Sequence, residues 1–159
     1  MWIDTHCHLD AQEFAGREAR LAADAARQGV GKIVIPAVAR SNFAGVAQLA
    51  AAQPNCVYAL GIHPLYVAQA QEEDLAVLRA ALEQALPDPR LVAVGEIGLD
   101  FFVPELRQGE LRDKQEHFFA EQLKIARDVG LPVLLHVRRA QDTILKYLRR
   151  IAVPGGIAH

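Results

Sequence analysis

The chain has 159 residues, of which 52% are hydrophobic, and its 17 basic and 19 acidic side chains leave a formal net charge of −2. A chain of this length and composition can bury a substantial core, which excludes an intrinsically disordered protein. The charge also excludes the global basic field that drives nonspecific binding to nucleic acid, so any polyanion would have to be held locally.

Short runs rich in Val, Ile and Leu recur along the chain, and each run is expected to form a β-strand. The predicted strands cover residues 2–4, 32–36, 57–61, 91–95, 132–136 and 156–159. Helical patterns fill the intervals between them. The alternation predicts a repeated βα unit, which is the building block of a parallel sheet.

The boundaries of several helices can be predicted from their flanking residues. The first helix is expected from about residue 16 to residue 28, ending at Gly29, and Ser41 is expected to cap the second helix. Pro87 and Gly130 are expected to close the third and fourth helices. Two apolar stripes should pack these helices on the sheet. They comprise Leu75, Leu78, Leu82 and Leu86 in the third helix, and Phe119, Leu123 and Ala126 in the fourth.

Six strands and five helices suggest an α/β fold of the TIM (β/α)8 barrel type in which only about six of the eight strands are present. A closed barrel needs roughly 250 residues, so the chain is expected to form a single domain, 1–159, that is incomplete at its C-terminus. The alternative is an open doubly wound sheet, which this length could complete. Such a sheet would normally end on a covering helix, so we favour the incomplete barrel.

Five potential metal ligands lie at or just after the C-terminal ends of predicted strands. They are His6, His8, Glu96, His136 and His159. In a parallel βα barrel the strand C-termini open onto one face, where catalytic residues gather. The placement of these residues therefore predicts a metal-dependent hydrolase.

The residue types of this set suit a metal centre. Alternate side chains of a strand share a face, so His6 and His8 can chelate one cation while Cys7 points away. The Glu96 carboxylate can span two cations with one oxygen on each, which an imidazole nitrogen cannot do.

Each of these assignments has a structural alternative. The first two histidines can be hydrogen-bonded in a polar loop, and Glu96 can be a buried carboxylate paired with an arginine. His136 can be an ordinary neutral core histidine, and His159 can be a frayed terminal residue.

Four motifs occur in order over essentially the whole chain. They are HCHLD at residues 6–10, GIHP at 61–64, GEIGLD at 95–100 and LPVLLH at 131–136. Together they resemble the TatD family of metal-dependent deoxyribonucleases, and most of all its YjjV-like branch of bacterial hydrolases. The resemblance implies an amidohydrolase-like TIM barrel with a dinuclear divalent-metal site.

In that family the first metal would be bound by His6 and His8, and the second by His136 and His159. Glu96 would bridge both cations and take part in catalysis. Zn, Mn, Mg and Ni all remain open, because mixed nitrogen and oxygen ligands accept each of them. A pair of cations would activate a water molecule and give the site a local positive charge despite the acidity of the chain.

The resemblance assigns His63 to catalysis through the substrate phosphate rather than to a metal, and a loop histidine without a role is the alternative. Arg138 could also contact the phosphate. With Arg139 it begins a basic stretch whose other members are Lys146, Arg149 and Arg150. Such a stretch is more often a solvated helix face.

Five further polar or thiol-bearing positions have other expected roles. Asp100 is expected to orient the metal ligands, and Asp10 to be a cap or turn residue. His117, within a predicted helix, is expected to face solvent. The two cysteines, Cys7 and Cys56, are expected to be packing residues without a disulfide, in a cytoplasmic protein without membrane association.

The implied reaction is hydrolysis of DNA phosphodiester bonds, with a single strand or a DNA end as substrate. One alternative is a hydrolase of the same scaffold acting on amide, ester or aminoacyl bonds. The other is an inactive truncated chain with a non-catalytic role. The family pattern continues beyond the sixth strand to an Asp that completes the first metal, so we expect a fragment with weak or no activity. The open first and sixth strands could support self-association.

Overall fold

The computed structural model describes residues 1–159 and contains one six-stranded sheet in the order β1-β2-β3-β4-β5-β6. Every neighbouring pair of strands is parallel. The strands are β1 (Trp2–Asp4), β2 (Val30–Pro36), β3 (Cys56–Leu60), β4 (Leu91–Asp100), β5 (Val133–Arg138) and β6 (Gly156–Ala158). Strand order therefore follows chain order, as it does around a βα barrel.

Five α-helices connect the strands. They are α1 (Glu18–Arg27), α2 (Phe43–Ala52), α3 (Glu73–Ala85), α4 (Gly109–Val129) and α5 (Gln141–Leu148). Single 3-10 turns, η1 (Gln12–Phe14), η2 (Arg40–Asn42), η3 (Pro64–Tyr66) and η4 (Pro104–Leu106), lie within the connections. No helix combines the length and the apolar character needed to cross a bilayer.

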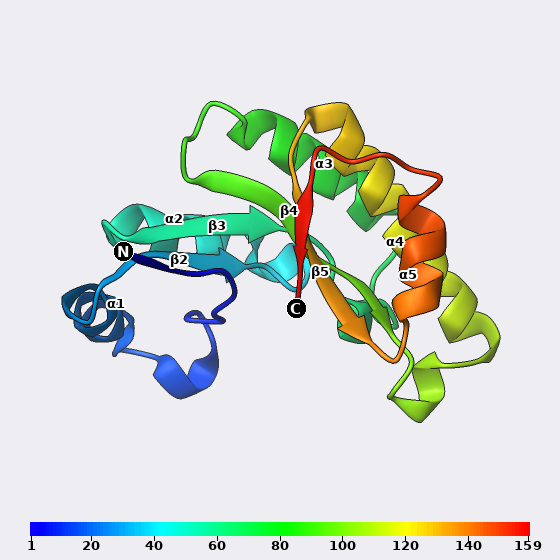
Figure 1. Cartoon of the computed structure of the whole chain (residues 1–159), viewed down its shortest axis with the longest axis horizontal. Helices are drawn as coiled ribbons and strands as arrows, with labels where there is room; N and C mark the ends of the chain where they lie inside the picture. The colour runs from blue at the N-terminus through cyan, green and yellow to red at the C-terminus, as the bar shows by residue number, and fades with distance from the viewer.

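The two faces of the sheet are packed differently. A core of 31 buried residues, including Ile35, Tyr58 and Leu60, lies between the strands and the helices (Figure 1). The opposite face carries a smaller cluster of five buried residues, among them Val34 and Val57, which alternate along the strands with the helix-facing positions. A doubly wound sheet would place helices on both faces. The prediction of six barrel strands is therefore confirmed.

Strand lengths differ from the prediction where site residues lie. β1 ends at Asp4, so His6 and His8 lie in the segment after the strand and not on it. β4 continues through the predicted end at Gly95, so that Glu96 lies inside it, and β5 likewise continues past His136. The continuation of β4 was not predicted, because Gly95 and Gly98 lie in it and glycine is disfavoured in strands.

Two details of the helices correct the prediction. The residue preceding α2 is Asn42, not Ser41, and the Asn42 side chain accepts hydrogen bonds from the backbone N–H groups of Val38 and Ala39. Leu86 lies at the end of α3 and is 45% exposed, so it does not join the apolar stripe on the sheet. The other predicted stripe residues of α3 and α4 are buried.

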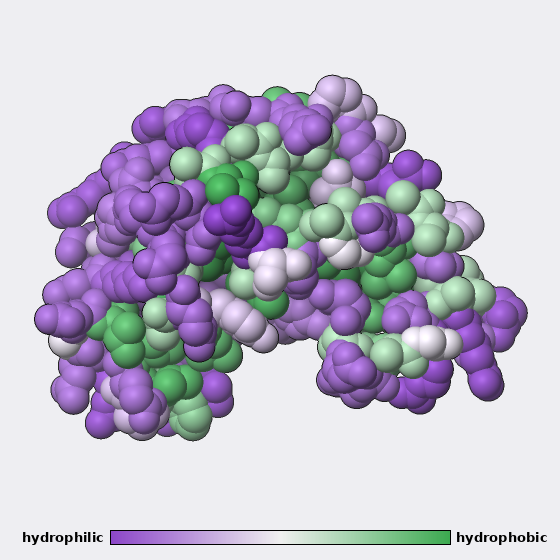
Figure 2. Space-filling model, turned by 180° about the vertical axis from the view of Figure 1, so that it is seen from behind, coloured by the Kyte–Doolittle hydropathy of each residue, from purple (hydrophilic) through white to green (hydrophobic).

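Loop residues at the strand C-termini leave apolar surface exposed. Leu65 and Tyr66 follow β3, and Phe102 follows β4; all three are more than two-fifths exposed. Seen from behind, the lower edge of the molecule is notched, and hydrophobic residues reach the surface on both sides of the notch (Figure 2). A ligand at the strand ends would thus meet both apolar and polar groups.

β4 and β5 approach each other closely at two glycines of β4. Gly95 has φ of +147° and Gly98 has φ of +148°, a region that side-chain-bearing residues rarely adopt. A β-carbon at Gly98 would overlap the carbonyl oxygen of His136, and one at Gly95 would lie 2.6 Å from that of Leu134. The two glycines therefore allow β4 and β5 to lie close together, so that the side chains of Glu96 and His136 come into contact.

Gly98→Ala is expected to lower the free energy of unfolding by about 2 kcal/mol or more, because the new methyl group meets backbone that cannot move away. Urea denaturation followed by circular dichroism measures the change. Gly45→Ala is the matched control: it lies in α2 with open space around it, and alanine should stabilise that helix by up to about 1 kcal/mol. Equal effects of the two substitutions would contradict the close approach.

Candidate metal centre

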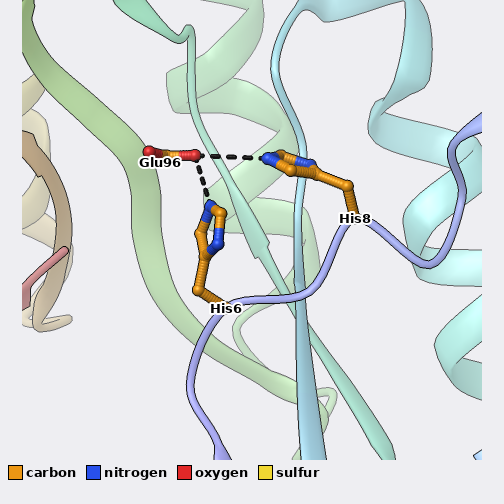
Figure 3. A group of neighbouring side chains, drawn as sticks. All are labelled: His6, His8 and Glu96. Carbon is orange, nitrogen blue, oxygen red and sulfur yellow. Dashed lines mark hydrogen bonds and ion pairs between the residues drawn. The ribbon is translucent and has the colours of Figure 1, made fainter.

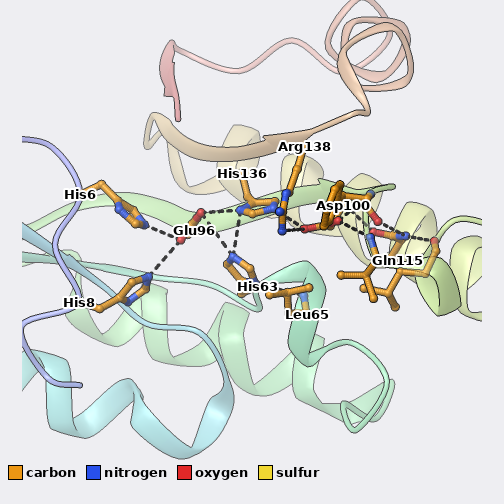
Figure 4. Close-up of polar contacts among 12 residues, drawn as sticks. His6, His8, His63, Leu65, Glu96, Asp100, Gln115, His136 and Arg138 are labelled. Atoms are coloured by element: carbon orange, nitrogen blue, oxygen red, sulfur yellow. Dashed lines mark hydrogen bonds and ion pairs between the residues drawn. The ribbon is translucent and has the colours of Figure 1, made fainter. Parts of the chain in front are cut away.

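One carboxylate lies at the centre of the C-terminal side of the sheet. Glu96 is 1% exposed, and its Oε2 lies 2.6 Å from His6 Nε2 and 3.3 Å from His8 Nε2 (Figure 3). Its Oε1 lies 3.0 Å from His136 Nδ1 and 3.4 Å from His63 Nε2 (Figure 4). Each oxygen therefore faces a different pair of imidazoles.

The first pair is positioned by the segment after β1. The backbone N–H of Cys7 donates to the carbonyl of Val34 at 3.0 Å, which ties this segment to β2. The rings of His6 and His8 meet edge to face with 4.7 Å between their centroids. The two histidines therefore lie together, as predicted. Their proximity depends on the hydrogen bond that ties this segment to β2, and not on the alternation of side chains along a strand.

His136 is oriented by a buried carboxylate. Its Nε2 lies 3.0 Å from Oδ2 of Asp100, which is fully buried, so Nε2 carries the proton and donates it. The other nitrogen, Nδ1, lies 3.0 Å from Glu96. It donates to that carboxylate when the ring is charged, and it becomes the ring's ligand atom when a cation replaces its proton. Such a carboxylate behind a histidine is a common feature of metal sites. The expected orienting role of Asp100 agrees with this contact.

His63 also carries its proton on Nε2, but in this ring it is Nε2 that faces Glu96. Its Nδ1 accepts a hydrogen bond of 3.1 Å from the backbone N–H of Leu65 at the start of η3, so Nε2 carries the proton. That Nε2 lies 3.1 Å from Nδ1 of His136 and can donate to it or to Glu96. The proton on Nε2 makes His63 a hydrogen-bond donor in the structure, which suits a phosphate contact.

His159 is not among the imidazoles that face Glu96. Its ring stacks on that of His6, with 3.9 Å between centroids and 23° between planes. Its backbone is hydrogen-bonded to Leu135 and Val137, on either side of His136 in β5. The predicted ligand His159 therefore lies beside the cluster, while His136 at 3.0 Å and His63 at 3.4 Å face the second carboxylate oxygen.

The charges of the cluster are strongly coupled. Burial opposes ionisation of Glu96, but hydrogen bonds from His136, His6, His63 and His8 outweigh it and hold the pKa of the carboxyl well below its usual range. The hydrogen bond with Glu96 raises the pKa of His8. Burial lowers the pKa of His63, which keeps this ring neutral.

The pKa of His136 is shifted upward by its neighbours. Burial opposes the charged ring, but Glu96 and Asp100 favour it more and raise the pKa. For Asp100 itself, burial again opposes the charge, and hydrogen bonds from the backbone of Val103, from His136 and from the backbone of Phe102 lower its pKa. The carboxylates are therefore ionised and the imidazoles around them supply protons that a cation could replace.

Two buried glutamines of α4 hold the backbone that carries the site. Oε1 of Gln122 accepts from the N–H of Ile62 at 2.7 Å, and its Nε2 donates to the carbonyl of Ile62 at 3.1 Å. Gln115, two turns earlier, makes the same pair of contacts with the backbone of Asp100. Neither glutamine was predicted from the sequence as a site residue. The available signal was two glutamines on the helix face that also carries Phe119.

A cleft of about 520 Å³ borders the cluster, and its walls come from the segment after β1, from η2 and from η3. His8 and His63 lie in its lining, as do Asp10 and Tyr66. One Asp10 oxygen accepts a hydrogen bond from Asn42, and the other is buried without a partner. Asp10 is thus a turn residue that holds two segments together, as expected.

The remaining predicted positions lie outside the cluster. Arg138 is exposed at the end of β5, 3.9 Å from Asp100. His117 is exposed on α4 and pairs with Glu72 across the surface, in agreement with the expectation that it faces solvent. Cys7 and Cys56 are both free thiols.

These features define a βα-barrel protein with a cluster of metal-ligating side chains at the strand C-termini. The family model described as TatD-related DNase matches residues 3–159. The chain therefore belongs to the TatD-related DNase family, as its motifs predict.

Known relatives support this assignment. The chain is 40% identical over 99% of its length to the uncharacterized metal-dependent hydrolase YjjV of Escherichia coli K12. The crystal structure of that protein superposes with a TM-score of 0.91. The chain is also 33% identical to the 3'-5' ssDNA/RNA exonuclease TatD of Edwardsiella piscicida, again over 99% of its length. It spans 59% and 58% of these two relatives.

Gln122→Leu is expected to lower the free energy of unfolding by about 2–4 kcal/mol, because the buried N–H and carbonyl of Ile62 lose their only side-chain partner. Chemical denaturation measures this. Gln48→Leu, on the exposed side of α2, is the matched control and should change stability by less than about 0.5 kcal/mol. A loss no larger than that of the control would show that Gln122 does not support the site.

Proposed function

We propose that this chain carries the metal centre of a divalent-metal-dependent hydrolase that cleaves phosphodiester bonds in nucleic acid. The observation that carries the proposal is the buried Glu96 carboxylate, whose two oxygens face separate pairs of imidazoles. A carboxylate is the side chain that can bridge two cations. The exonuclease of Edwardsiella piscicida supports nucleic acid as the substrate class.

The residues present fit a pair of divalent cations. One group of ligand atoms comprises His6, His8 and Glu96, and a second comprises His63, Glu96 and His136, with all atoms of a group within 4.8 Å of one another. In our proposal the first group holds one cation. Glu96 and His136 hold the other, together with His159, whose backbone lies beside His136.

Each neighbouring residue then has a distinct role. Asp100 keeps the proton of His136 on Nε2, so that Nδ1 stays available. His63, neutral and with its proton on Nε2, donates a hydrogen bond to a phosphoryl oxygen of the substrate. Arg138 adds a charged donor at the rim of the site. Bound divalent cations would supply Lewis acidity and activate the attacking water.

The proposal requires a specific pattern of metal stoichiometry. After loading with Zn or Mn, elemental analysis of the purified chain should find two cations, Glu96→Ala should lose both, and His6→Ala should lose one. His63→Ala should keep two, because His63 is a donor and not a ligand. His117→Ala, an exposed histidine on α4, is the matched control. Two cations bound by Glu96→Ala would rule out a bridging carboxylate.

Hydrolysis tests the activity itself. The metal-loaded chain should cleave bis-p-nitrophenyl phosphate at a low but measurable rate, in line with the weak activity expected from the sequence, and EDTA should abolish the reaction. His63→Ala should reduce kcat/KM by about tenfold to a hundredfold, since it removes one donor to the phosphate. p-Nitrophenyl acetate and an aminoacyl ester test the alternative bond classes. Turnover of these esters without turnover of the diester would favour a carbonyl substrate, and no turnover of any would favour a non-catalytic chain.

A further inference from the structure

Two arginines and one aromatic ring form a cluster at the end of β5. The guanidinium carbon of Arg138 lies 3.7 Å from the ring centroid of Phe102, and that of Arg139 lies 4.8 Å from the same centroid. Phe102 is 42% exposed. A cation held over an aromatic face loses freedom but keeps its hydrogen-bonding edges available. The ring therefore orders two guanidinium groups at the surface.

The backbone of Arg139 allows this arrangement. β5 ends at Arg138, and in a continued strand Arg139 would point to the opposite face. Arg139 instead has φ of +53° and is the one residue other than glycine with positive φ in the chain. Such a conformation is unfavourable for a side-chain-bearing residue and is concentrated at functional sites. It turns the second guanidinium towards the same ring as the first.

The two arginines differ in whether a carboxylate lies near their positive charge. Nη1 of Arg138 lies 3.9 Å from the buried Asp100 carboxylate. Arg139 forms no ion pair in the structure, and its guanidinium lies over the aromatic face of Phe102. An ordered guanidinium without a carboxylate partner is a binding site for an external anion, and its planar fork matches a phosphate.

The position of the cluster identifies the kind of anion. Asp100 joins the cluster to the metal centre: its Oδ2 accepts from His136, and its Oδ1 accepts from the N–H of Phe102 (Figure 4). Arg138 lies beside Asp100 at the rim of the site. A phosphate on Arg139 would therefore be a neighbour of a phosphate at the metal centre, as successive phosphates are in a nucleic-acid strand.

We propose that Arg139, ordered over Phe102 beside Arg138, binds a second backbone phosphate of a single-stranded nucleic acid whose scissile phosphate lies at the metal centre. This inference deepens the proposed function and rests on it. The favoured substrate is then a strand with at least two phosphates and not an isolated phosphate ester. Specificity for a polyanion arises from one local cluster.

Binding of a fluorescein-labelled oligothymidylate in EDTA tests the inference without hydrolysis. Fluorescence anisotropy over a series of NaCl concentrations gives Kd and the slope of log K against log salt. Arg139→Gln should raise Kd about threefold to tenfold and reduce the slope by about 0.7, the value for one phosphate contact on a single strand. Arg139→Lys should restore most of the slope, because it restores the charge.

Arg20→Gln is the matched control, because it removes the same charge from the exposed surface of α1, at the other end of the sheet. It should leave Kd and slope unchanged. Phe102→Leu should weaken binding in the same direction as Arg139→Gln, because the guanidinium loses its platform. Equal Kd and slope for Arg139→Gln and Arg20→Gln, or no binding by the parent chain, would overturn the inference.

The two proposals can fail separately. Arg139-dependent binding without hydrolysis of bis-p-nitrophenyl phosphate by the metal-loaded parent would keep the phosphate subsite and reject the phosphodiesterase. If the parent hydrolyses that diester but Arg139→Gln binds the oligonucleotide as well as the parent does, the phosphodiesterase function is supported and the phosphate subsite is rejected. The diester carries a single phosphate, so its turnover tests the metal centre alone.

Discussion

The structure depends on one ionised carboxylate in a buried place. An isolated carboxylate would be expelled from such a site or protonated. Glu96 stays ionised there because imidazoles surround it. These imidazoles come from segments that follow β1 and β3 and from β5. One charge thus joins parts of the chain that are up to 90 residues apart. The same arrangement of nitrogen and oxygen atoms is what divalent cations require.

The position of the Glu96 carboxylate depends on the surrounding backbone as well as on its hydrogen bonds to the imidazoles. Gly95 and Gly98 let β4 approach β5 closely, which places Glu96 and His136 at hydrogen-bond distance. Two glutamines of α4 hold the ends of β3 and β4 from the helix-covered face of the sheet. Each of them hydrogen-bonds both the backbone N–H and the backbone carbonyl of one buried residue, Ile62 or Asp100. Rigid support of this kind keeps ligand atoms in position before any cation arrives.

Much of this was predictable because the signals are local. Apolar runs indicated the strands. The candidate ligands His6, His8, Glu96 and His136 were recognisable as polar residues at or near the ends of these runs. Ring direction depends on partners distant in sequence, so the contact of His63 with Glu96 and the stacking of His159 on His6 could not be predicted from spacing. The position of Gln115 and Gln122 on the buried face of α4 indicates that they are buried, but not what they bind. Their partners, the backbone groups of Ile62 and Asp100, leave no mark on the sequence.

Local charge can oppose the charge of the whole chain. The formal net charge is −2, yet the C-terminal side of the sheet gathers histidines, Arg138 and Arg139 around two buried carboxylates. Glu96 and Asp100 are already engaged by imidazoles, so they offer little repulsion to an incoming anion. Cations bound at Glu96 would make this side more positive still. At physiological ionic strength surface charges act over about 8 Å, so a phosphate at the site would respond to this cluster and hardly to acidic residues elsewhere. A mildly acidic chain can therefore select a polyanion through the geometry of one site.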